Sequence, residues 1–574
     1  AYLSEPFYCE GQNPTQARKL RFFSGPLYPE PTLLEIFYDL FFAANYNVFS
    51  DTQQVTNGSK FRAHVGYFCL LWQTWFLVTM FDVRYLSDSI SARMTRAIQL
   101  GVLIGFTVVA PSFDLINQHA NTFRTMSLLL MVSRVTLVVE YCGTLWHVRK
   151  YSKAHRPMLY QISIHLASSI FYLGFSFSFY DGMRGSSYMT WYFLPSAEAL
   201  AVVLLAYWKP VLSVDKTHIM KRMTLLTVMI MGDNIAEIAK TIVTIVKSPE
   251  SWDRITISVL TASVVTVYFI LLTYFDWLRE SFYLPPLRLQ FWIVLHLPFH
   301  LALVFFTHGL TQFLLWSKII VQFQRLNATT ASRVYLGNVT GPIGPLVQRS
   351  INETVQSFFD DYPPVWPNLR QQIDELLRQI SDVPESFWRH IMETDRMFRE
   401  DFTDMPQEFQ DSGATLNEIY DQVFLIMTNS LFGAFGVDLP ADIGSSKPED
   451  VDLQTHVFFE AWDIYRLTFV CGYLSCSCTI ILMALLAIAA RSAPYKAWQL
   501  LRLFIVLLLA VGIGLVSLLW FDLVRSGDFL QSFWILPTIT LVWTVVMILT
   551  HVNGEGIKRN IQRLRNKGWL SSGQ

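Results

Sequence analysis

The chain has 574 residues, of which 52% are hydrophobic and only 16% are charged, and its mean hydropathy is +0.33. This composition excludes an ordinary soluble protein of this length and indicates a membrane protein that crosses the bilayer many times. The formal net charge of −1 argues against a nucleic-acid partner, and six cysteines are too few for a disulfide framework.

Apolar runs of the length that a bilayer requires, about 20 residues each, occur twelve times along the chain. They predict an all-α polytopic membrane protein with about twelve transmembrane helices. The predicted spans cover residues 33–50, 61–81, 97–113, 124–147, 159–180, 190–208, 222–246, 255–275, 291–322, 465–490, 499–521 and 533–551.

Residues 323–464, between spans nine and ten, form a large hydrophilic block that we call the cap. Its stretches "NLRQQIDELLRQISD" and "SFWRHIMETDRMFRED" have helical apolar spacing, so we expect a helical extracytoplasmic insertion. The apolar stretch "VFLIMTNSLFGAFGV" is short for a span, which favours a membrane-lying or cap-buried helix over a thirteenth crossing. The expected domains are a cytosolic N-terminal segment (1–32), a first six-span half (33–208), spans seven to nine (209–322), the cap (323–464), spans ten to twelve (465–551) and a basic cytosolic tail (552–574).

Two independent patterns predict that both termini are cytosolic. In that orientation the short inner loops hold sixteen Lys and Arg residues and the short outer loops hold seven, which is the bias expected of membrane proteins. Asn-x-Ser/Thr sequons are glycosylated only on the extracytoplasmic side, and all four fall on the predicted outer side. The sequons are at Asn57, Asn327, Asn338 and Asn352. We therefore expect a glycoprotein of the eukaryotic secretory pathway, in the plasma membrane or in a vacuolar or other endomembrane.

Ionisable residues inside the predicted spans are candidate functional sites, because each costs about 3 kcal/mol or more to insert. The candidates are Glu35, Asp39, Asp82, Arg134, Glu198, Arg222, Asp233, Glu237 and His296. Of these, Glu35, Asp39 and Asp233 lie in apolar runs without an obvious local cation, which favours a functional role. Arg134 stays protonated, so we expect an acid on another span to neutralise it. The candidate partners of Arg134 are Glu35, Asp39 and Glu198.

For Asp82, Glu237 and His296 a structural interpretation is favoured. Glu237 with Lys240 has the spacing of an intrahelical ion pair, and Asp82 with Arg84 has the position of a pair at the membrane interface. The stretch "HLPFH" places His296 and His300 on one helix face. Because neither a zincin glutamate nor a cysteine cluster accompanies these histidines, packed or pore-lining histidines are favoured over metal ligands.

The sequence contains no Gly-rich phosphate loop, no serine-nucleophile elbow and no metalloprotease motif. We therefore expect neither an enzyme nor a bound cofactor or metal. The expected partners are the lipid bilayer and an inorganic cation or a proton, with a homodimer left open and no nucleic acid.

Six blocks resemble the low temperature requirement A (LtrA) family of multi-pass membrane proteins, in family order across residues 30–310. "LLEIFYDLFFA" resembles the opening signature of the family, "FDVRYLSDSISAR" its second-span segment, and "VSRVTLVVEY" its fourth-span arginine pattern. "HIMKRMTLLTVMIMGDNI", "YFILLTYFDW" and "VLHLPFHLAL" resemble the later blocks. Lys221 and Asp233 replace the usual glutamates of the family. The resemblance implies a multi-pass fold, and the sequon-bearing cap is an addition expected of a fungal or other eukaryotic member.

The two acidic signatures lie on the first and seventh spans, and an even interval preserves orientation, so we expect two parallel six-span halves. Glu35 and Asp39 should then face the interior where these spans meet. The first functional hypothesis is a proton- or cation-conducting channel or an ion-coupled transporter, with His296 as a proton relay. The alternative is a non-transporting membrane sensor or scaffold with structural buried ion pairs. An intramembrane enzyme is the third and least favoured hypothesis.

Overall fold

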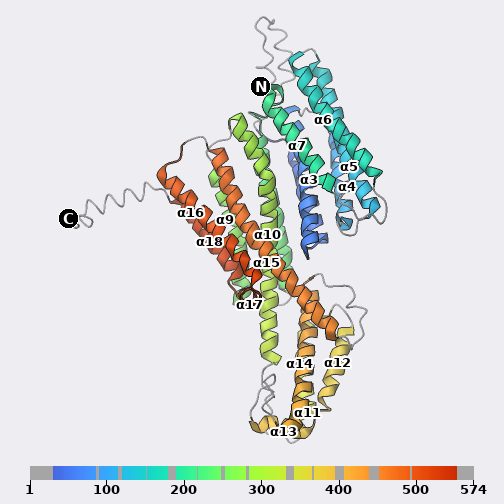
Figure 1. The fold of residues 1–574 in the computed structure, drawn as a ribbon, viewed down its shortest axis with the longest axis vertical. Helices are drawn as coiled ribbons and strands as arrows, with labels where there is room; N and C mark the ends of the chain where they lie inside the picture. The colour runs from blue at the N-terminus through green and yellow to red at the C-terminus, as the bar shows by residue number, and fades with distance from the viewer. Residues whose placement is uncertain are drawn as a thin grey trace, which may run out of the picture.

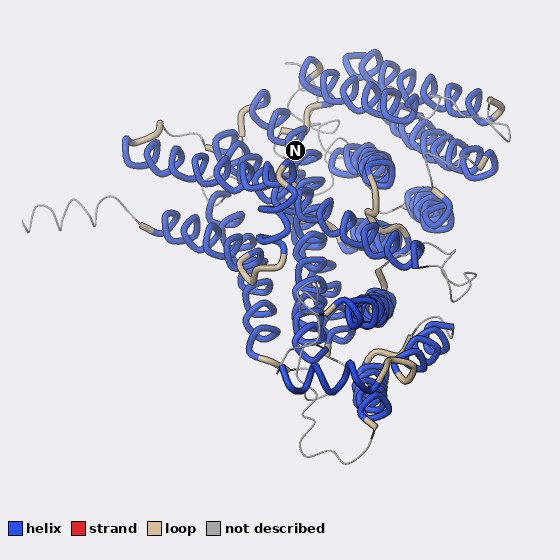
Figure 2. Tube along the Cα trace, turned by 60° about the horizontal axis from the view of Figure 1, so that its bottom comes forward, coloured by secondary structure: helices blue, strands red, loops and turns tan. Residues whose placement is uncertain are grey.

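The computed structural model describes residues 30–85, 89–113, 119–149, 152–178, 189–215, 217–246, 252–278, 284–330, 342–364, 368–394, 406–437, 451–491 and 494–552. All regular secondary structure in these residues is helical, as predicted (Figure 2). Most of the predicted N-terminal segment, nearly all of the basic tail and the sequon at Asn338 lie outside the described residues.

The described helices fall into two groups of six, together with the cap helices (Figure 1). The first group comprises α2 (Leu33–Thr52), α3 (Gly58–Tyr85), α4 (Ile90–Val109), α5 (Ala120–Val148), α6 (Ser152–Ser176) and α7 (Thr190–Trp208). The second comprises α8 (Ile219–Ile245), α9 (Arg254–Leu278), α10 (Pro286–Thr330), α15 (Val451–Ala490), α16 (Ala497–Val516) and α18 (Ile535–His551), with the short α17 (Leu523–Leu530) before α18. The cap contains α11 (Ile343–Asp361), α12 (Asn368–Ile380), α13 (Glu385–Thr394) and α14 (Gln407–Ala434).

The two groups of six helices repeat the same order of neighbours. For example, α3 packs against α7 as α9 packs against α18, and α2 packs against α4 as α8 packs against α10. Helices α2 and α8 lie side by side and run in the same direction, because Glu35 contacts His218 near their starts and Asp51 contacts Lys240 near their ends. The groups are therefore parallel, in agreement with the even interval between the two acidic signatures.

Within the described ranges, eight helices are long and apolar enough to cross a membrane, so the chain is an integral multi-pass membrane protein. These eight are α4, α5, α6, α7, α9, α10, α15 and α16, and the bent pair α17–α18 raises the number to nine if it forms one span. Helices α2, α3 and α8, which were also predicted as spans, are not among these candidates, because they do not meet the combined requirement for high hydropathy and few charged residues. They carry the polar and charged side chains that face the interface between the two groups.

Helices α10 and α15 extend beyond the membrane-crossing bundle. They contain 45 and 40 residues, which correspond to about 68 Å and about 60 Å, whereas a bilayer core is about 30 Å thick. The two helices are antiparallel neighbours, and α14 packs against both. Together they form a stalk that carries the cap at the lower end of the molecule in Figure 1.

The cap has a hydrophobic core of its own, in which Leu369, Trp388 and Met427 are buried. The start of α11 is held by α13, because the Ile343 amide donates a hydrogen bond of 3.1 Å to the Glu385 carboxylate. The apolar stretch that was expected to be cap-buried or membrane-lying forms the second half of α14. That half packs into the cap and against the stalk, and α14 is not among the eight candidate spans.

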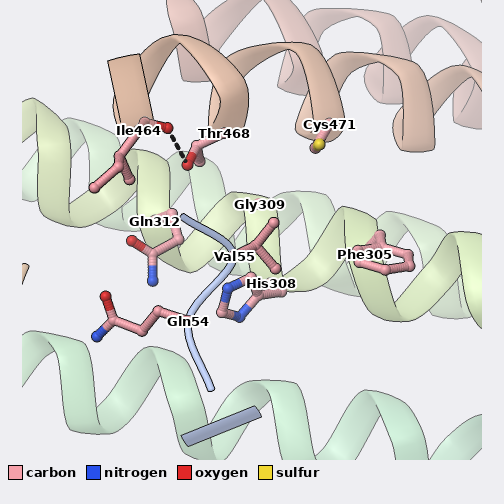
Figure 3. Close-up of a pocket in the computed structure, with 9 residues that line it drawn as sticks. All are labelled: Gln54, Val55, Phe305, His308, Gly309, Gln312, Ile464, Thr468 and Cys471. Atoms are coloured by element: carbon pink, nitrogen blue, oxygen red, sulfur yellow. Dashed lines mark hydrogen bonds between the residues drawn. The ribbon is translucent and has the colours of Figure 1, made fainter. Parts of the chain in front are cut away.

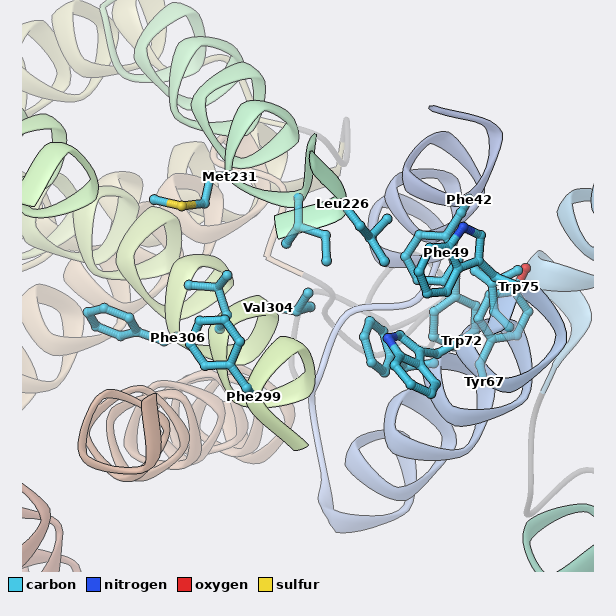
Figure 4. Close-up of a cluster of buried hydrophobic side chains, with 14 of the residues drawn as sticks. Phe42, Phe49, Tyr67, Trp72, Trp75, Leu226, Met231, Phe299, Val304 and Phe306 are labelled. Carbon is cyan, nitrogen blue, oxygen red and sulfur yellow. The ribbon is translucent and has the colours of Figure 1, made fainter. Parts of the chain in front are cut away.

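An aromatic core fills the interface between the two groups of helices. Figure 4 shows Phe42, Trp72 and Trp75 of α2 and α3 on one side, with Leu226 of α8 and Phe299 of α10 facing them. All of these side chains are buried. This core joins the first group to the second, and the buried charges described below lie beside it.

Candidate functional site

Arg222 of α8 is the centre of a buried ion-pair network that joins the two groups of helices. Its guanidinium lies 2.9 Å from Asp39 Oδ1, 3.3 Å from Glu35 Oε1 and 2.9 Å from Asp82 Oδ2. All four side chains are fully buried. Glu35 and Asp39, which have no obvious cation nearby in the sequence, therefore share a cation from a helix that lies more than 180 residues away along the chain.

The capping box at the start of α2 holds Glu35 in position for this network. The Thr32 amide donates a hydrogen bond of 2.8 Å to the Glu35 carboxylate, and the Thr32 hydroxyl accepts one from the Glu35 amide. Residues four apart share a helix face, so Asp39 follows Glu35 one turn later and faces the same neighbour. The capping box at the start of α2 thus helps to place two carboxylates against α8.

Three further side chains complete the network. The Trp75 indole donates a hydrogen bond of 2.6 Å to Asp39 Oδ1, and His218 Nε2 lies 2.9 Å from Glu35 Oε1. Arg96 of α4 forms an ion pair with Asp82. The interpretation of Asp82 with Arg84 as an interfacial pair is therefore wrong. The partners of Asp82 are Arg96 and Arg222.

A second buried network lies within the first group of helices. Arg134 Nε donates a hydrogen bond of 2.9 Å to Glu198 Oε2, and the other oxygen of Glu198 lies 2.8 Å from His165 Nδ1. Thr74 accepts a third bond, of 3.1 Å, from Arg134. The prediction that an acid on another span neutralises Arg134 is thus confirmed, with Glu198 as the partner among the three candidates.

Both networks are suited to holding helices together. Each carboxylate in them contacts a guanidinium, and each guanidinium is enclosed by partners from at least one other helix. Removing one partner from such a network leaves an uncompensated buried charge, which is strongly unfavourable. Glu35, Asp39, Asp82, Arg134, Glu198 and Arg222 are therefore accounted for as structural contacts.

Asp233 lies in a different environment, in a pocket at the interface between the two groups of helices. This α2–α8 pocket has an empty volume of about 450 Å³, its mouth included. Its lining comprises Phe42, Ala43, Tyr46, Asn47, Ser50, Phe68, Ile230, Asp233, Asn234, Glu237, Val304 and His308. Asp233 is partly exposed in the pocket and has no ion-pair partner within 4 Å among the described residues.

Oxygen atoms with unused acceptor capacity accompany Asp233 in the same lining. The side-chain oxygen of Asn47 is buried without a hydrogen-bond partner in the described structure. Carboxylate and amide oxygens are hard ligands that suit protons and alkali or alkaline-earth cations. The pocket thus has the charge and the donor atoms to attract a small cation.

Glu237, which lines this pocket, takes part in an ion pair. Lys240 Nζ lies 2.7 Å from Glu237 Oε1 on its own helix and 2.8 Å from Asp51 Oδ2 on α2. The predicted intrahelical pair of Glu237 with Lys240 is thus present, and it extends to a second helix. Because the Lys240 side chain is about half exposed, this link between α2 and α8 is accessible to solvent and to exchange.

The two histidines of "HLPFH" are packed core residues. His296 Nδ1 lies 2.8 Å from the Trp292 carbonyl, and its Nε2 lies 3.2 Å from the Tyr274 hydroxyl. His300 lies between the Trp72 indole and the Thr227 hydroxyl. Neither residue lines the α2–α8 pocket. Within the described residues, no group of three or more His, Cys, Asp or Glu side chains is placed to hold a metal ion.

The sequence analysis missed four residues of these sites: Asn47, Arg96, His165 and His218. Arg96 was assigned to a loop because α4 begins at Ile90, seven residues before the predicted span. His165 lies four residues after Gln161, and their side chains contact each other at 2.8 Å. Two polar residues four apart in an apolar run share one helix face, and this pattern was the available indication in the sequence. Asn47 and His218 carry no such signal, because their roles depend on the packing of α2 against α8.

Two of the predicted glycosylation sites are exposed. The Asn57 side chain accepts hydrogen bonds from the Ser59 and Lys60 amides at the start of α3, and Asn352 lies on the exposed face of α11. The side chain of Asn327 is outside the described part of the structure, as is Asn338. Glycosylation of these residues stays a prediction.

One comparison with known proteins gives a match. The model of the family described as bacterial low temperature requirement A protein (LtrA) matches residues 31–339, which is more than half of the chain. No curated protein and no solved structure matches. The matched range extends from α2 to α10, so it contains both ion-pair networks and the polar residues of the α2–α8 pocket. The chain belongs to the low temperature requirement A family.

Proposed function

We propose that this protein moves a proton or a small inorganic cation across its membrane, as a channel or as an ion-coupled transporter. The α2–α8 pocket is the cation site, with the Asp233 carboxylate as its charge and the Asn47 amide oxygen as a neutral ligand. The observation that carries the proposal is that Asp233, unlike Glu35 and Asp39, is a partly exposed intramembrane acid without an ion-pair partner in the described structure.

The position of the pocket supports this proposal. Transporters built from two repeats bind their substrate and coupling ion at the interface between the repeats, near the middle of the membrane. The α2–α8 pocket lies at such an interface, since its lining comes from both groups of helices. An intramembrane carboxylate that lines a cavity is, by default, part of an ion pathway. This role requires neither a nucleophile nor a bound metal, so we propose no enzymatic activity.

The Arg222 network closes the pathway on the other side of the pocket. Asp39 and Arg222 lie about two to three turns closer to the helix starts than Asn47 and Asp233 do, and they are fully buried. A cation that reaches Asp233 therefore meets a buried network of ion pairs before it reaches the starts of α2 and α8. Opening of this network is the step that completes transport.

Replacement of Asp233 tests the proposal. In reconstituted vesicles we expect Asp233→Asn to lower proton, potassium or sodium flux about tenfold or more, which corresponds to about 1.4 kcal/mol of lost cation attraction. Thermal stability should change little, because Asp233 has no ion-pair partner to strand. Asp276→Asn is the matched control, since Asp276 is a partly buried acid on α9 that pairs with His551 at 3.3 Å. Absence of flux in the wild type across a range of voltages and pH gradients would refute transport.

The second candidate is a non-transporting sensor or scaffold. The specific observation in its favour is that the seven Asp, Glu and Arg side chains of the Arg222 and Arg134 networks are all paired and buried. This candidate predicts that Asp233→Asn has the same small effect as Asp276→Asn in every assay. The flux measurement therefore separates the two functions.

We also propose that α2, α3 and α8 cross the membrane, which gives twelve spans with both termini in the cytosol and the cap outside. Their lengths of 20, 28 and 27 residues are sufficient, and each occupies the position in its group that the repeat requires. The protein then resides in a membrane of the eukaryotic secretory pathway. It carries glycans on its outer sequons.

A further inference from the structure

A second pocket lies beside the first, between the stalk helices and the loop that joins α2 to α3. This α10–α15 pocket has an empty volume of about 420 Å³. On α10 its lining is one helix face that includes His308 and Gln312, and on α15 it includes Thr468 and Cys471 (Figure 3). Gln54 covers it from the α2–α3 loop.

Among the described residues, His308 is the one that lines both pockets. Its Nδ1 lies 3.4 Å from the Ser50 hydroxyl of α2, so the ring spans the space between α10 and the end of α2. In Figure 3 the ring lies between the helix that carries it and the backbone of Val55. The His308 side chain thus lies between the two pockets.

The α10–α15 pocket includes the point at which the two stalk helices cross, at Gly309. There the stalk helices cross in close contact, because a Cβ atom added to Gly309 would lie 2.9 Å from the Gly472 Cα. A Cβ atom added to Gly472 would meet the Phe313 ring at 2.5 Å. The polar residues Gln312 and Thr468 lie on the cap side of this crossing, and Phe305 and His308 lie on the other side.

The chemistry of this lining differs from that of the α2–α8 pocket. Gln54, Gln312 and Thr468 are neutral and polar, and the lining contains no acid. Such a surface can replace part of the hydration of a cation without holding it, whereas the charges of Asp233 and Glu237 lie in the next pocket. The cap adjoins the entrance, since the Gln54 side-chain amide donates a hydrogen bond of 2.9 Å to the Gly436 carbonyl after α14.

We propose that the cation enters from the cap side through the α10–α15 pocket and passes His308 to reach Asp233. This route rests on the proposed cation transport, and it assigns His308 as the residue that gates access between the two pockets. The His308 ring occludes the passage at rest, and a change of its rotamer joins the two spaces.

Cysteine accessibility tests the route independently of flux. A membrane-impermeant cationic methanethiosulfonate reagent is added to the cap side of vesicles that contain the full chain, and peptide mass spectrometry identifies the labelled cysteine. We expect labelling of the native Cys471, which lines the α10–α15 pocket, and none of the fully buried Cys476 on the same helix. Absence of label at Cys471 would overturn the route at its first step.

The second step is tested with Asn47→Cys, which places a thiol in the α2–α8 pocket. We expect His308→Trp to slow labelling of this thiol at least tenfold and to leave labelling of Cys471 unchanged, whereas His308→Ala should accelerate it. Unchanged Cys471 labelling also shows that the variant is folded. Equal labelling of Asn47→Cys with His, Trp or Ala at position 308 would refute the gate. Since no flux is measured, loss of the proposed transport by the Asp233→Asn test is a separate result.

Discussion

Arg222 and Asp233 lie on the same helix about three turns apart, and their surroundings differ in what they allow each charge to do. Arg222 is enclosed by three carboxylates from α2 and α3. Asp233 faces a pocket and has no ion-pair partner in the described structure. A saturated buried charge stabilises packing, and an unsaturated one remains free to bind a mobile ion. Helix α8 therefore supplies both the arginine that holds the two groups of helices together and the carboxylate of the pocket.

Replacement of Arg222 tests whether the Arg222 network stabilises the fold. We expect Arg222→Met to lower the free energy of unfolding by about 3–5 kcal/mol, because Glu35, Asp39 and Asp82 are left buried without their shared cation. Chemical or thermal unfolding in detergent provides the measurement. Lys221→Met is the matched control, since Lys221 is the preceding residue and its side chain is one-third exposed. Equal stability of the two variants would contradict a structural role for the network.

The sequence identifies which charged residues enter the membrane, but it does not identify their partners. Glu35, Asp39 and Arg222 were all recognised as candidates, yet their mutual contact depends on α2 packing against α8 in a parallel arrangement. The partner of Arg134 was easier to predict, because an arginine cannot lose its charge and only a few buried acids could neutralise it. Asp233 was interpreted as functional because no cation lies nearby in the sequence. The described residues likewise include no ion-pair partner for it, and its functional role stays a prediction.

At the scale of elements, the crossing of α10 and α15 joins the stalk to the bundle. The two helices are the most extensively packed pair outside the first group, and glycines permit their closest approach at Gly309 and Gly472. Small residues allow helix backbones in membranes to approach closely, where dispersion contacts replace the hydrophobic effect as the driving force. The close crossing therefore depends on glycine, which has no side chain, at positions 309 and 472.

A methyl group added at this crossing should weaken it. We expect Gly309→Ala to destabilise the protein by about 1–3 kcal/mol, because the new Cβ would lie 2.9 Å from the backbone of Gly472 and one helix must shift. Gly512→Ala on α16 is the control, since a Cβ there meets no atom within 4 Å. Melting temperatures of the two variants provide the comparison. A Gly309→Ala variant as stable as Gly512→Ala would show that the crossing can relax without loss.

Asp253 anchors the start of α9 to the stalk and provides a test that depends on pH. Its carboxylate accepts a hydrogen bond of 2.6 Å from the Thr256 amide and lies 3.1 Å from Arg325 and 3.4 Å from Lys318 of α10. Partial burial raises the pKa of Asp253, but the hydrogen bonds from Thr256 and the charge of Lys318 outweigh burial. The pKa therefore lies below its ordinary value of 3.8.

The lowered pKa of Asp253 sets the direction of the pH effect. The stabilisation is fully present above the ordinary pKa of an aspartate and is lost as the pH falls through the folded value. We expect the wild-type melting temperature to decrease below about pH 4. Asp253→Asn should melt lower than the wild type at pH 7, and the difference between the two should shrink on acidification. A difference that is constant from pH 7 to pH 3 would contradict this role.

Element boundaries explain most of what the sequence analysis missed. The apolar scan located all the helices that meet the length and hydropathy requirement, but it ended them where the hydropathy fell. Helix α4 therefore appeared to begin after Arg96, and α15 appeared to begin at residue 465 rather than at Val451. Helical structure that continues beyond the apolar run depends on tertiary contacts with the neighbouring helices and the cap.

At the scale of the whole molecule, two parallel groups of six helices account for the position of the pocket and of the cap. The even interval of six between α2 and α8 gives them the same direction, so acids near the start of one face a cation near the start of the other. The stalk helices α10 and α15 are third and fourth in the second group, as α4 and α5 are in the first. Their extension by the cap insertion is what makes the second group different.

The length of the stalk makes the topology testable with glycans. The inner loops hold sixteen basic residues and the outer loops seven, so the cap should lie outside. We expect Asn352→Gln to remove one glycan from the protein expressed in a eukaryotic host, because Asn352 is exposed on α11 far from the bundle. Apparent mass before and after endoglycosidase treatment measures this.

An engineered sequon between residues 149 and 156 is the matched opposite case. This segment runs from the end of α5 into the first turn of α6 at the predicted cytosolic face, and its basic residues include Arg149 and Arg156. Oligosaccharyltransferase acts only in the lumen, so the new sequon should remain unmodified while Asn57 and Asn352 are modified. A glycan at the engineered site would show that the topology is the inverse of the predicted one. The entry route through the α10–α15 pocket would then open to the cytosol, since the cap and Asp233 keep their positions relative to each other whichever side of the membrane they face.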